Sequence, residues 1–160
     1  CMNLGALSKG AFRFTSPDAL GMPMYEFVMW GFYTLNTIRF LGGTAPRGSR
    51  WPTVILAAAF AATFSIVSEP GVLTLLSGTV LLISLALYRE PMDFAYASYM
   101  LTVGASIEYV GVWTGQWSYP GNPLGGVPPW FIPMWGGVGL FTRRLLLPLL
   151  PQDAGSAASG

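Results

Sequence analysis

The chain has 160 residues, of which 52% are hydrophobic and only 9% are charged, and its mean hydropathy is +0.52. Soluble domains carry about 25% charged residues, so this composition argues against an ordinary soluble globule and against a disordered chain. The formal net charge of +1 excludes nucleic-acid binding through bulk electrostatics. Histidine is absent and Cys1 is the only cysteine. Because zinc, haem and iron–sulfur sites depend on these two residue types, we expect no such metal centre.

Runs with few or no charges approach the ~20 apolar residues that cross a bilayer. Turn signals that carry a charge, Ser68-Glu69-Pro70-Gly71 and Arg89-Glu90-Pro91, separate the central runs and place a proline at a helix start. The segment from 70 to 88 is therefore predicted to form an antiparallel hairpin with the segment before it. The predicted spans, in chain order, are 24–41, 51–68, 70–88, 92–113 and 129–142.

The basic residues predict an orientation for these spans. If Arg47 and Arg50 face the cytoplasm, six of the eight basic residues fall on that side, and only Lys9 and Arg13 fall on the other. We therefore expect an all-α fold, a polytopic bundle of about five transmembrane helices in a prokaryotic cytoplasmic membrane. It would form a single domain over 1–150, followed by a flexible tail over 151–160.

An internal repeat is the most informative pattern: segments 10–41 and 115–146 superpose without gaps after a shift of 105 positions. Each copy is interpreted as an aromatic loop, a proline and a helix that ends in arginine, and sites in repeated membrane proteins tend to lie between the copies. A span precedes the second copy, whereas only residues 1–8 precede the first, so we expect that a helix is missing upstream and that the native gene product is longer; a copy truncated during evolution is the alternative. The shift places Gly10 on Gly115, Phe12 on Trp117, Phe14 on Tyr119, Gly21 on Gly126, Pro23 on Pro128, Met29-Trp30-Gly31 on Met134-Trp135-Gly136, and Arg39 on Arg144.

Two ionisable residues, Glu26 and Glu108, lie within the predicted spans, where such side chains are rare and often functional. Glu108 shares a helical stripe with Gly104 and Gly111, and small residues on that stripe predict that it faces the interior of the bundle. A carboxyl group in apolar surroundings has a raised pKa and can donate a proton near neutral pH. A purely structural role is the alternative. The candidate hydrogen-bond partners for that role are Tyr25, Tyr109, Tyr119 and Trp117.

Other polar and glycine-rich features are interpreted structurally. Asp93 falls in the first turn of its helix, where the helix dipole favours an anion. Glu69 and Glu90 are interpreted as turn charges. The glycines between 136 and 139 lie inside a predicted helix and indicate close helix packing rather than a phosphate loop. The repeated Trp and Tyr residues indicate either an interfacial belt or a shaped pocket.

One stretch, Glu108-Tyr-Val-Gly111-Val-Trp-Thr114-Gly115-Gln-Trp-Ser-Tyr119, continues into Leu124-Gly125-Gly126-Val127-Pro128 and Trp135. This pattern resembles the membrane proteins of carotenoid synthesis, namely the bacterioruberin-precursor hydratases and related hydratases of acyclic carotenoid ends. It covers residues 104 to 140. Pro23-Met-Tyr-Glu26-Phe is similar to a signature of the small membrane lycopene cyclases, but Tyr25 stands where the first glutamate belongs, and the second copy, at 128–131, has no carboxylate.

The resemblance implies acid-catalysed hydration, or cyclisation, of a polyene end group, without a cofactor. Protonation of the terminal alkene gives a tertiary carbocation that water captures, which requires an acid in apolar surroundings and aromatic faces near the cation. Glu108 or Glu26 would be the catalytic acid, and the substrate would be a lipophilic polyene or lipid in the membrane. The alternative is a non-catalytic polytopic subunit of a larger membrane complex that binds lipid or pigment. The expected substrate-binding residues are Trp117, Tyr119, Trp130, Trp135 and Tyr25.

Overall fold

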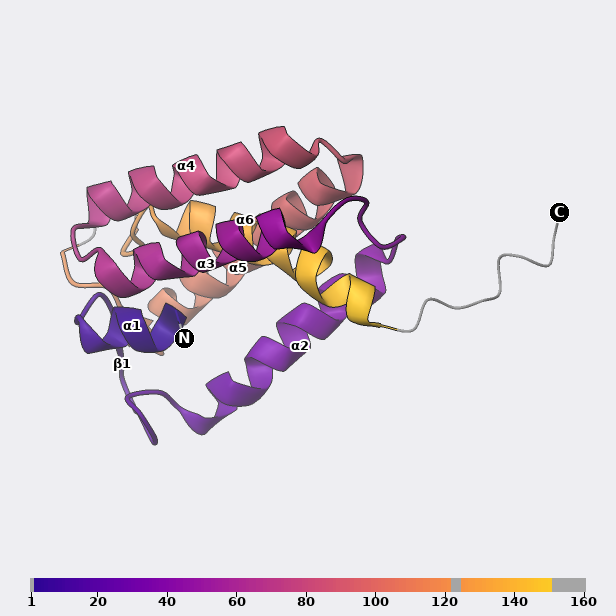
Figure 1. Cartoon of the computed structure of the whole chain (residues 1–160). Helices are drawn as coiled ribbons and strands as arrows, with labels where there is room; N and C mark the ends of the chain where they lie inside the picture. Colours follow the sequence, from indigo (N-terminus) through magenta and orange to yellow (C-terminus); the bar gives the residue numbers. More distant parts are fainter. Residues whose placement is uncertain (1, 122–124, 151–160) are drawn as a thin grey trace, which may run out of the picture.

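The computed structural model describes residues 2–121 and 125–150, which form a mostly helical fold (Figure 1). These residues contain six α-helices and a pair of strands with two residues each. After the last α-helix the chain continues through a π-helical turn, Thr142–Leu146, and a 3-10 turn, Leu147–Leu149. The helices are α1 (Met2–Ser8), α2 (Met24–Leu41), α3 (Arg50–Ile66), α4 (Pro70–Tyr88), α5 (Pro91–Trp113) and α6 (Phe131–Phe141); the strands are β1 (Arg13–Phe14) and β2 (Trp117–Ser118).

Local sequence sets the ends of α4. The Glu69 carboxylate accepts hydrogen bonds from the backbone amides of Gly71 (2.9 Å) and Val72 (2.5 Å). Pro70 occupies the first turn, where its missing N–H leaves no helical hydrogen bond unmade. At the other end, Arg89 adopts a left-handed backbone (φ +53°) and stops the helix. Both turn signals of the sequence therefore terminate helices as predicted.

Helices α5 and α6 form the most extensive pair in the described part of the chain. Their close approach requires glycine, because a Cβ at Gly139 would lie 2.2 Å from the carbonyl oxygen of Tyr96. The prediction that the glycines at 136–139 mark close packing is confirmed. The α3–α4 hairpin lies on one side of this pair and α2 lies on the other (Figure 1).

The predicted polytopic bundle of about five transmembrane helices is wrong. Within residues 2–121 and 125–150 there are six α-helices, and by length and composition α4 alone is long and apolar enough to cross a membrane. The mean hydropathy of the whole chain led to too many predicted spans, because helix length and apolar composition differ from one helix to the next. Helix α3 is apolar but has 17 residues, and α6 ends after 11 residues where the π-helical turn begins. The predicted tail at 151–160 lies outside the described residues.

Two features that the sequence did not predict are helix α1 and the strand pair. The strands are antiparallel, with Arg13 opposite Ser118 and Phe14 opposite Trp117. Arg13 and Ser118 are equivalent positions of the proposed repeat, and α1 precedes its first copy as the end of α5 precedes its second. Turn glycines at equivalent positions also share the left-handed conformation, and their geometry agrees with the register of the repeat. The pairs are Gly10 (φ +69°) with Gly115 (φ +72°), and Gly21 (φ +76°) with Gly126 (φ +87°).

A buried cluster of charges joins the start of α5 to the π-helical turn that follows α6. Asp93 is fully buried and accepts hydrogen bonds from Arg143 and from Arg144, whose Nε lies 3.0 Å from both carboxylate oxygens. Glu90 pairs with the same two arginines at 2.7 and 2.9 Å, and it also accepts a hydrogen bond from the Arg47 backbone amide. The Arg144 guanidinium lies 3.5 Å above the Tyr88 ring. Asp93 does lie in the first turn of α5, as predicted, but its main contacts are ion pairs with Arg143 and Arg144, which the sequence did not predict.

We predict that Asp93→Asn destabilises the protein by about 3–5 kcal/mol, because it leaves two buried guanidinium groups with one carboxylate fewer. Denaturant unfolding of the purified protein, followed by circular dichroism, measures the change. Glu69→Gln is the control, since Glu69 is exposed and caps only its own helix, and its effect should be much smaller. Equal effects of the two substitutions would contradict the importance assigned to the cluster.

Candidate active site

Glu108 lies near the end of α5, on a face that two glycines keep open. A Cβ at Gly104 would lie 2.1 Å from the Trp135 side chain, and a Cβ at Gly111 would lie 2.0 Å from the Trp117 side chain. Both indoles therefore reach Glu108 only because these positions, one turn before and one turn after it, have no side chain. The small-residue stripe of the sequence correctly predicted that Glu108 faces inward.

Three aromatic side chains donate hydrogen bonds to the Glu108 carboxyl group. The Tyr119 hydroxyl and the Trp117 indole bind Oε2 at 2.6 and 3.1 Å, and the Trp135 indole binds Oε1 at 3.1 Å. Glu108 is only 5% exposed. The ion pairs found in residues 2–121 and 125–150 involve Glu90 and Asp93, not Glu108. This acid is therefore surrounded by neutral donors and has no cationic partner.

Glu26 lies in the first turn of α2 and is also buried. Glu26 and Glu108 line one partly open cavity of about 30 Å³. A cavity holds a water once it offers about 10–15 Å³, so this space suits one or two water molecules between polar groups. The remaining lining side chains are mostly aromatic. They include Phe12, Phe14, Trp30, Tyr33, Trp117, Tyr119, Trp130 and Trp135.

Burial changes the acidity of the groups around this cavity. It raises the pKa of Glu108, although the hydrogen bonds from Tyr119, Trp135 and Trp117 offset part of the effect. Burial also raises the pKa of Glu26, and the nearby charge of Glu108 raises it further. The pKa of Tyr33 rises to about 12, first through burial and then through the two carboxylates. Two acids that repel each other in this way favour a state in which one holds a proton.

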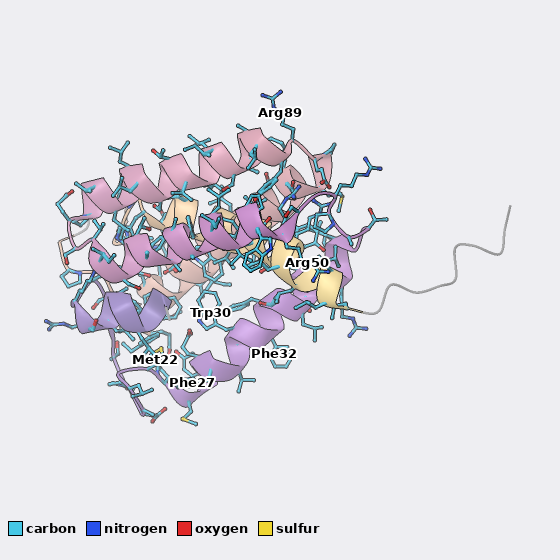
Figure 2. All side chains as sticks on the ribbon, viewed as in Figure 1. Met22, Phe27, Trp30, Phe32, Arg50 and Arg89 are labelled. Atoms are coloured by element: carbon cyan, nitrogen blue, oxygen red, sulfur yellow. The ribbon has the colours of Figure 1, made fainter. Side chains whose placement is uncertain are left out.

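Trp30 and Tyr33 complete the cavity wall, and the sequence analysis did not select them. The Trp30 ring stacks on Trp135 with centroids 5.3 Å apart and 9° between the planes, and Tyr33 meets Trp135 edge-on at 5.8 Å. Figure 2 shows Trp30 on the side of α2 that faces the other helices and Phe32 on its outer side. Trp30 and Trp135 are equivalent positions of the repeat, so the repeat was the signal that could have identified Trp30.

The structure brings together all but one of the predicted site residues. Tyr25 does not line the cavity: it is 43% exposed, and its hydroxyl donates a hydrogen bond to the Gln116 side chain at 3.2 Å. Tyr119 and Trp117 bond to Glu108, as the structural alternative expected. Leu124 of the family-like stretch lies outside the described residues. The predicted residues that line the cavity are Glu26, Glu108, Trp117, Tyr119, Trp130 and Trp135.

A larger groove adjoins the cavity. It has a volume of about 580 Å³ and lies between α2 and α5. Tyr33 and Ile107 line both the groove and the cavity, so these two side chains separate the spaces. The groove is amphipathic, since Phe40, Tyr99 and Val103 supply apolar surface, while Asn36 and Arg39 supply polar groups. An elongated molecule in the groove could reach the two acids only past the Tyr33 and Ile107 side chains.

The comparison with known proteins establishes the fold and not the activity. No known protein family and no curated protein matches this sequence. The crystal structure of a cross-linked trimer of MvINS matches with a TM-score of 0.75, covering 94% of this chain and 88% of that chain. At 18% sequence identity, the similarity concerns the arrangement of the helices. The resemblance to carotenoid-synthesis proteins therefore stays a prediction.

We predict that Gly104→Ala destabilises the protein by about 1–3 kcal/mol, because the new methyl group overlaps the Trp135 ring. Gly78→Ala is the matched control: nothing lies within 4 Å of a Cβ at this position in α4. The control should stabilise the helix by about 0.5–1 kcal/mol. Denaturant unfolding and tryptophan fluorescence measure both effects. A Gly104 variant as stable as the control would contradict the steric argument.

The raised pKa values also predict how stability depends on pH. A carboxyl group whose pKa is raised by folding stabilises the folded state while it is protonated. This contribution is lost as pH rises from the ordinary value of 4.5 through the folded pKa. Glu108→Gln should therefore flatten the decline in unfolding free energy that begins as pH rises above 4.5. The pKa of Glu69 is lowered by its hydrogen bonds from the Val72 and Gly71 amides, so this group makes stability depend on pH only below pH 4.5. Glu69→Gln should leave the slope in this window unchanged, and an unchanged slope in Glu108→Gln would contradict the prediction.

Proposed function

We propose that this protein hydrates the end group of an acyclic polyene of the carotenoid class, with Glu108 as the acid. The observation that carries the proposal is a buried carboxyl group with aromatic hydrogen-bond donors and no cationic partner. Burial raises the pKa of such a group and favours its protonated form, which is the form that can donate a proton to a substrate. The family-like stretch that includes Glu108, Trp117, Tyr119 and Trp135 supports the choice of substrate.

The surroundings of Glu108 suit a carbocation intermediate. Oε2 already accepts two hydrogen bonds, whereas Oε1 accepts one, so Oε1 has the free position for the acidic proton. Transfer of this proton to the terminal alkene forms a C–H bond and leaves a tertiary cation. The faces of Trp30 and Trp135 lie in the same cavity wall and would stabilise that positive charge. Water then forms the C–O bond and loses a proton, which gives a tertiary alcohol.

The groove between α2 and α5 is the proposed path for the polyene. The cavity at Glu108 has room for water only, so an end group enters when the side chains of Tyr33 and Ile107 move aside. Helix α2 contacts α5 much less extensively than α6 does, so α2 is the helix that can most easily move away from α5. The rest of the polyene would lie in the 580 Å³ groove.

We also propose a membrane location, on the evidence of α4 and not of a multi-span bundle. Only 17% of its most apolar stretch is buried within the structure, so this helix is not the covered core of a globule. Leu75 and Leu82 on α4 are each 68% exposed. Contact of such a surface with lipid removes it from water. A polyene substrate resides in the same medium.

Expression in a host that accumulates acyclic carotenoids tests the proposal. Liquid chromatography with mass spectrometry should reveal products heavier by one water. Glu108→Gln should lower their amount by about 10²–10⁴-fold, the usual contribution of a general acid, while Glu69→Gln should retain it. Full activity in a folded Glu108→Gln protein would exclude Glu108 as the acid.

A second candidate function, non-catalytic binding of lipid or pigment, is favoured by the difference in volume between the groove and the cavity, about 580 against 30 Å³. The same experiment distinguishes it. Unchanged carotenoids that co-purify with well-expressed protein would support binding and reject hydration.

A further inference from the structure

One end of the molecule, where α2 ends, α3 begins and α4 ends, carries several exposed arginines. Glu90 accepts hydrogen bonds from the Arg47 backbone amide and from the Arg144 side chain, which holds the loop before α3 against the start of α5. The Phe40 ring stacks on Tyr99 with centroids 5.1 Å apart, which holds the last turn of α2 against the same helix. This region, the arginine end, includes the exposed side chains of Arg39, Arg47, Arg50 and Arg89.

The acids at the arginine end do not neutralise these four side chains. Glu90 and Asp93 both pair with Arg143 and Arg144 in the buried cluster described above. Within residues 2–121 and 125–150, none of the four exposed arginines joins an ion pair. Of the six basic residues that the sequence assigns to one side, two are therefore neutralised inside the fold, and four face outward.

The opposite end of the molecule has no such excess of charge. Helix α1, strand β1 and the start of α4 lie there (Figure 1), and the side chains of this region include two bases and two acids. Glu26 and Glu108 are buried in the cavity and do not contribute to either end. The positive charge of the described surface is therefore concentrated at the arginine end. The balanced residues of the opposite end are Lys9, Arg13, Asp18 and Glu69.

Large aromatic side chains are exposed among the arginines. Phe40 follows Arg39 and is 73% exposed, and Trp51 follows Arg50 and is 74% exposed. Figure 2 shows Arg89 pointing away from α4 and from the other helices. A soluble anion needs no apolar surface, whereas the headgroup region of a bilayer offers anionic phosphates directly beside an interface that favours aromatic rings. The mixture of charge and aromatic surface therefore fits a lipid better than a soluble anion.

We propose that the arginine end binds the anionic headgroups of membrane phospholipids, of which phosphatidylglycerol is a simple example. This inference goes beyond the hydration proposed above and rests on the membrane location proposed with it. Helix α4, whose exposed apolar side chains support that location, ends beside Arg89, so its contacts with acyl chains and the contacts with headgroups form one continuous surface. Each arginine near an anionic membrane favours binding by about 5-fold, and salt weakens the effect.

The test measures quenching of tryptophan fluorescence by lipids with brominated acyl chains, using the full chain purified in a neutral detergent. Brominated phosphatidylglycerol and brominated phosphatidylcholine carry the same quencher and differ in headgroup charge. Wild type should be quenched at about 25-fold lower concentrations of phosphatidylglycerol at low salt, the product expected if two of the four arginines contact headgroups. High salt should reduce this preference.

Matched variants locate the contact. Arg50→Gln should lower the preference for phosphatidylglycerol by about 5-fold, whereas Arg13→Gln, an exposed arginine at the opposite end, should leave it unchanged. Trp51→Phe should remove the quenching that is specific to the anionic lipid, because Trp51 adjoins Arg50. Trp113→Phe should retain it: Trp113 is equally exposed, but it lies at the end of α5 that is far from the arginine end.

The outcomes distinguish this inference from the proposals on which it rests. Equal quenching of wild type by the two lipids would overturn the headgroup contact and leave the membrane location intact. A preference that Arg13→Gln lowers as much as Arg50→Gln would also overturn the assignment to the arginine end. No quenching by either lipid would overturn the membrane location together with this inference. The carotenoid products described above test the hydration separately.

Discussion

The burial of one carboxyl group without a cationic partner, that of Glu108, determines the arrangement of the aromatic part of this molecule. Glu108 receives hydrogen bonds from Trp117, Tyr119 and Trp135, so the loop after α5 and the start of α6 must both converge on it. The strand pair strengthens this convergence, because it fixes Trp117 opposite Phe14. A buried polar group without such donors would destabilise the fold by several kcal/mol, roughly 2–7 in apolar surroundings. The loop after α5 must therefore pack against Glu108 for the carboxyl group to receive its hydrogen bonds.

Helix α5 carries a second buried acid, Asp93, whose partners are cationic side chains rather than neutral donors. Asp93 lies 15 residues before Glu108 in the sequence, or about 22 Å along the helix, and it is neutralised by Arg143 and Arg144. Its ion pairs with two guanidinium groups join α5 to the π-helical turn after α6. An acid held by indole and phenol groups can exist in either protonation state. The first arrangement suits a structural role, and the second leaves Glu108 able to exchange a proton.

The chemistry proposed for the cavity depends on α2 as much as on α5 and α6. Trp30 stacks on the indole that binds Glu108, and Glu26 brings the second carboxyl group to the cavity. The groove on the same side of α5 offers the volume that the cavity lacks. A helix that supplies half of the site and packs less tightly than its neighbours can admit a substrate without disturbing the α5–α6 pair.

The sequence by itself determined the helices at 24–41 and 70–88, the turns at Glu69-Pro70 and Arg89-Glu90-Pro91, and the inward orientation of Glu108, because these depend on local propensity and helical spacing. The repeat already paired Trp30 with Trp135, yet nothing local showed that their rings touch. Mean hydropathy did not determine how many helices cross a membrane, since apolar residues are distributed unevenly among them. The tertiary structure alone decided the partners of Asp93, the exclusion of Tyr25 from the cavity and the small volume of that cavity. Each of these depends on contacts between residues far apart in the chain, which local patterns do not encode.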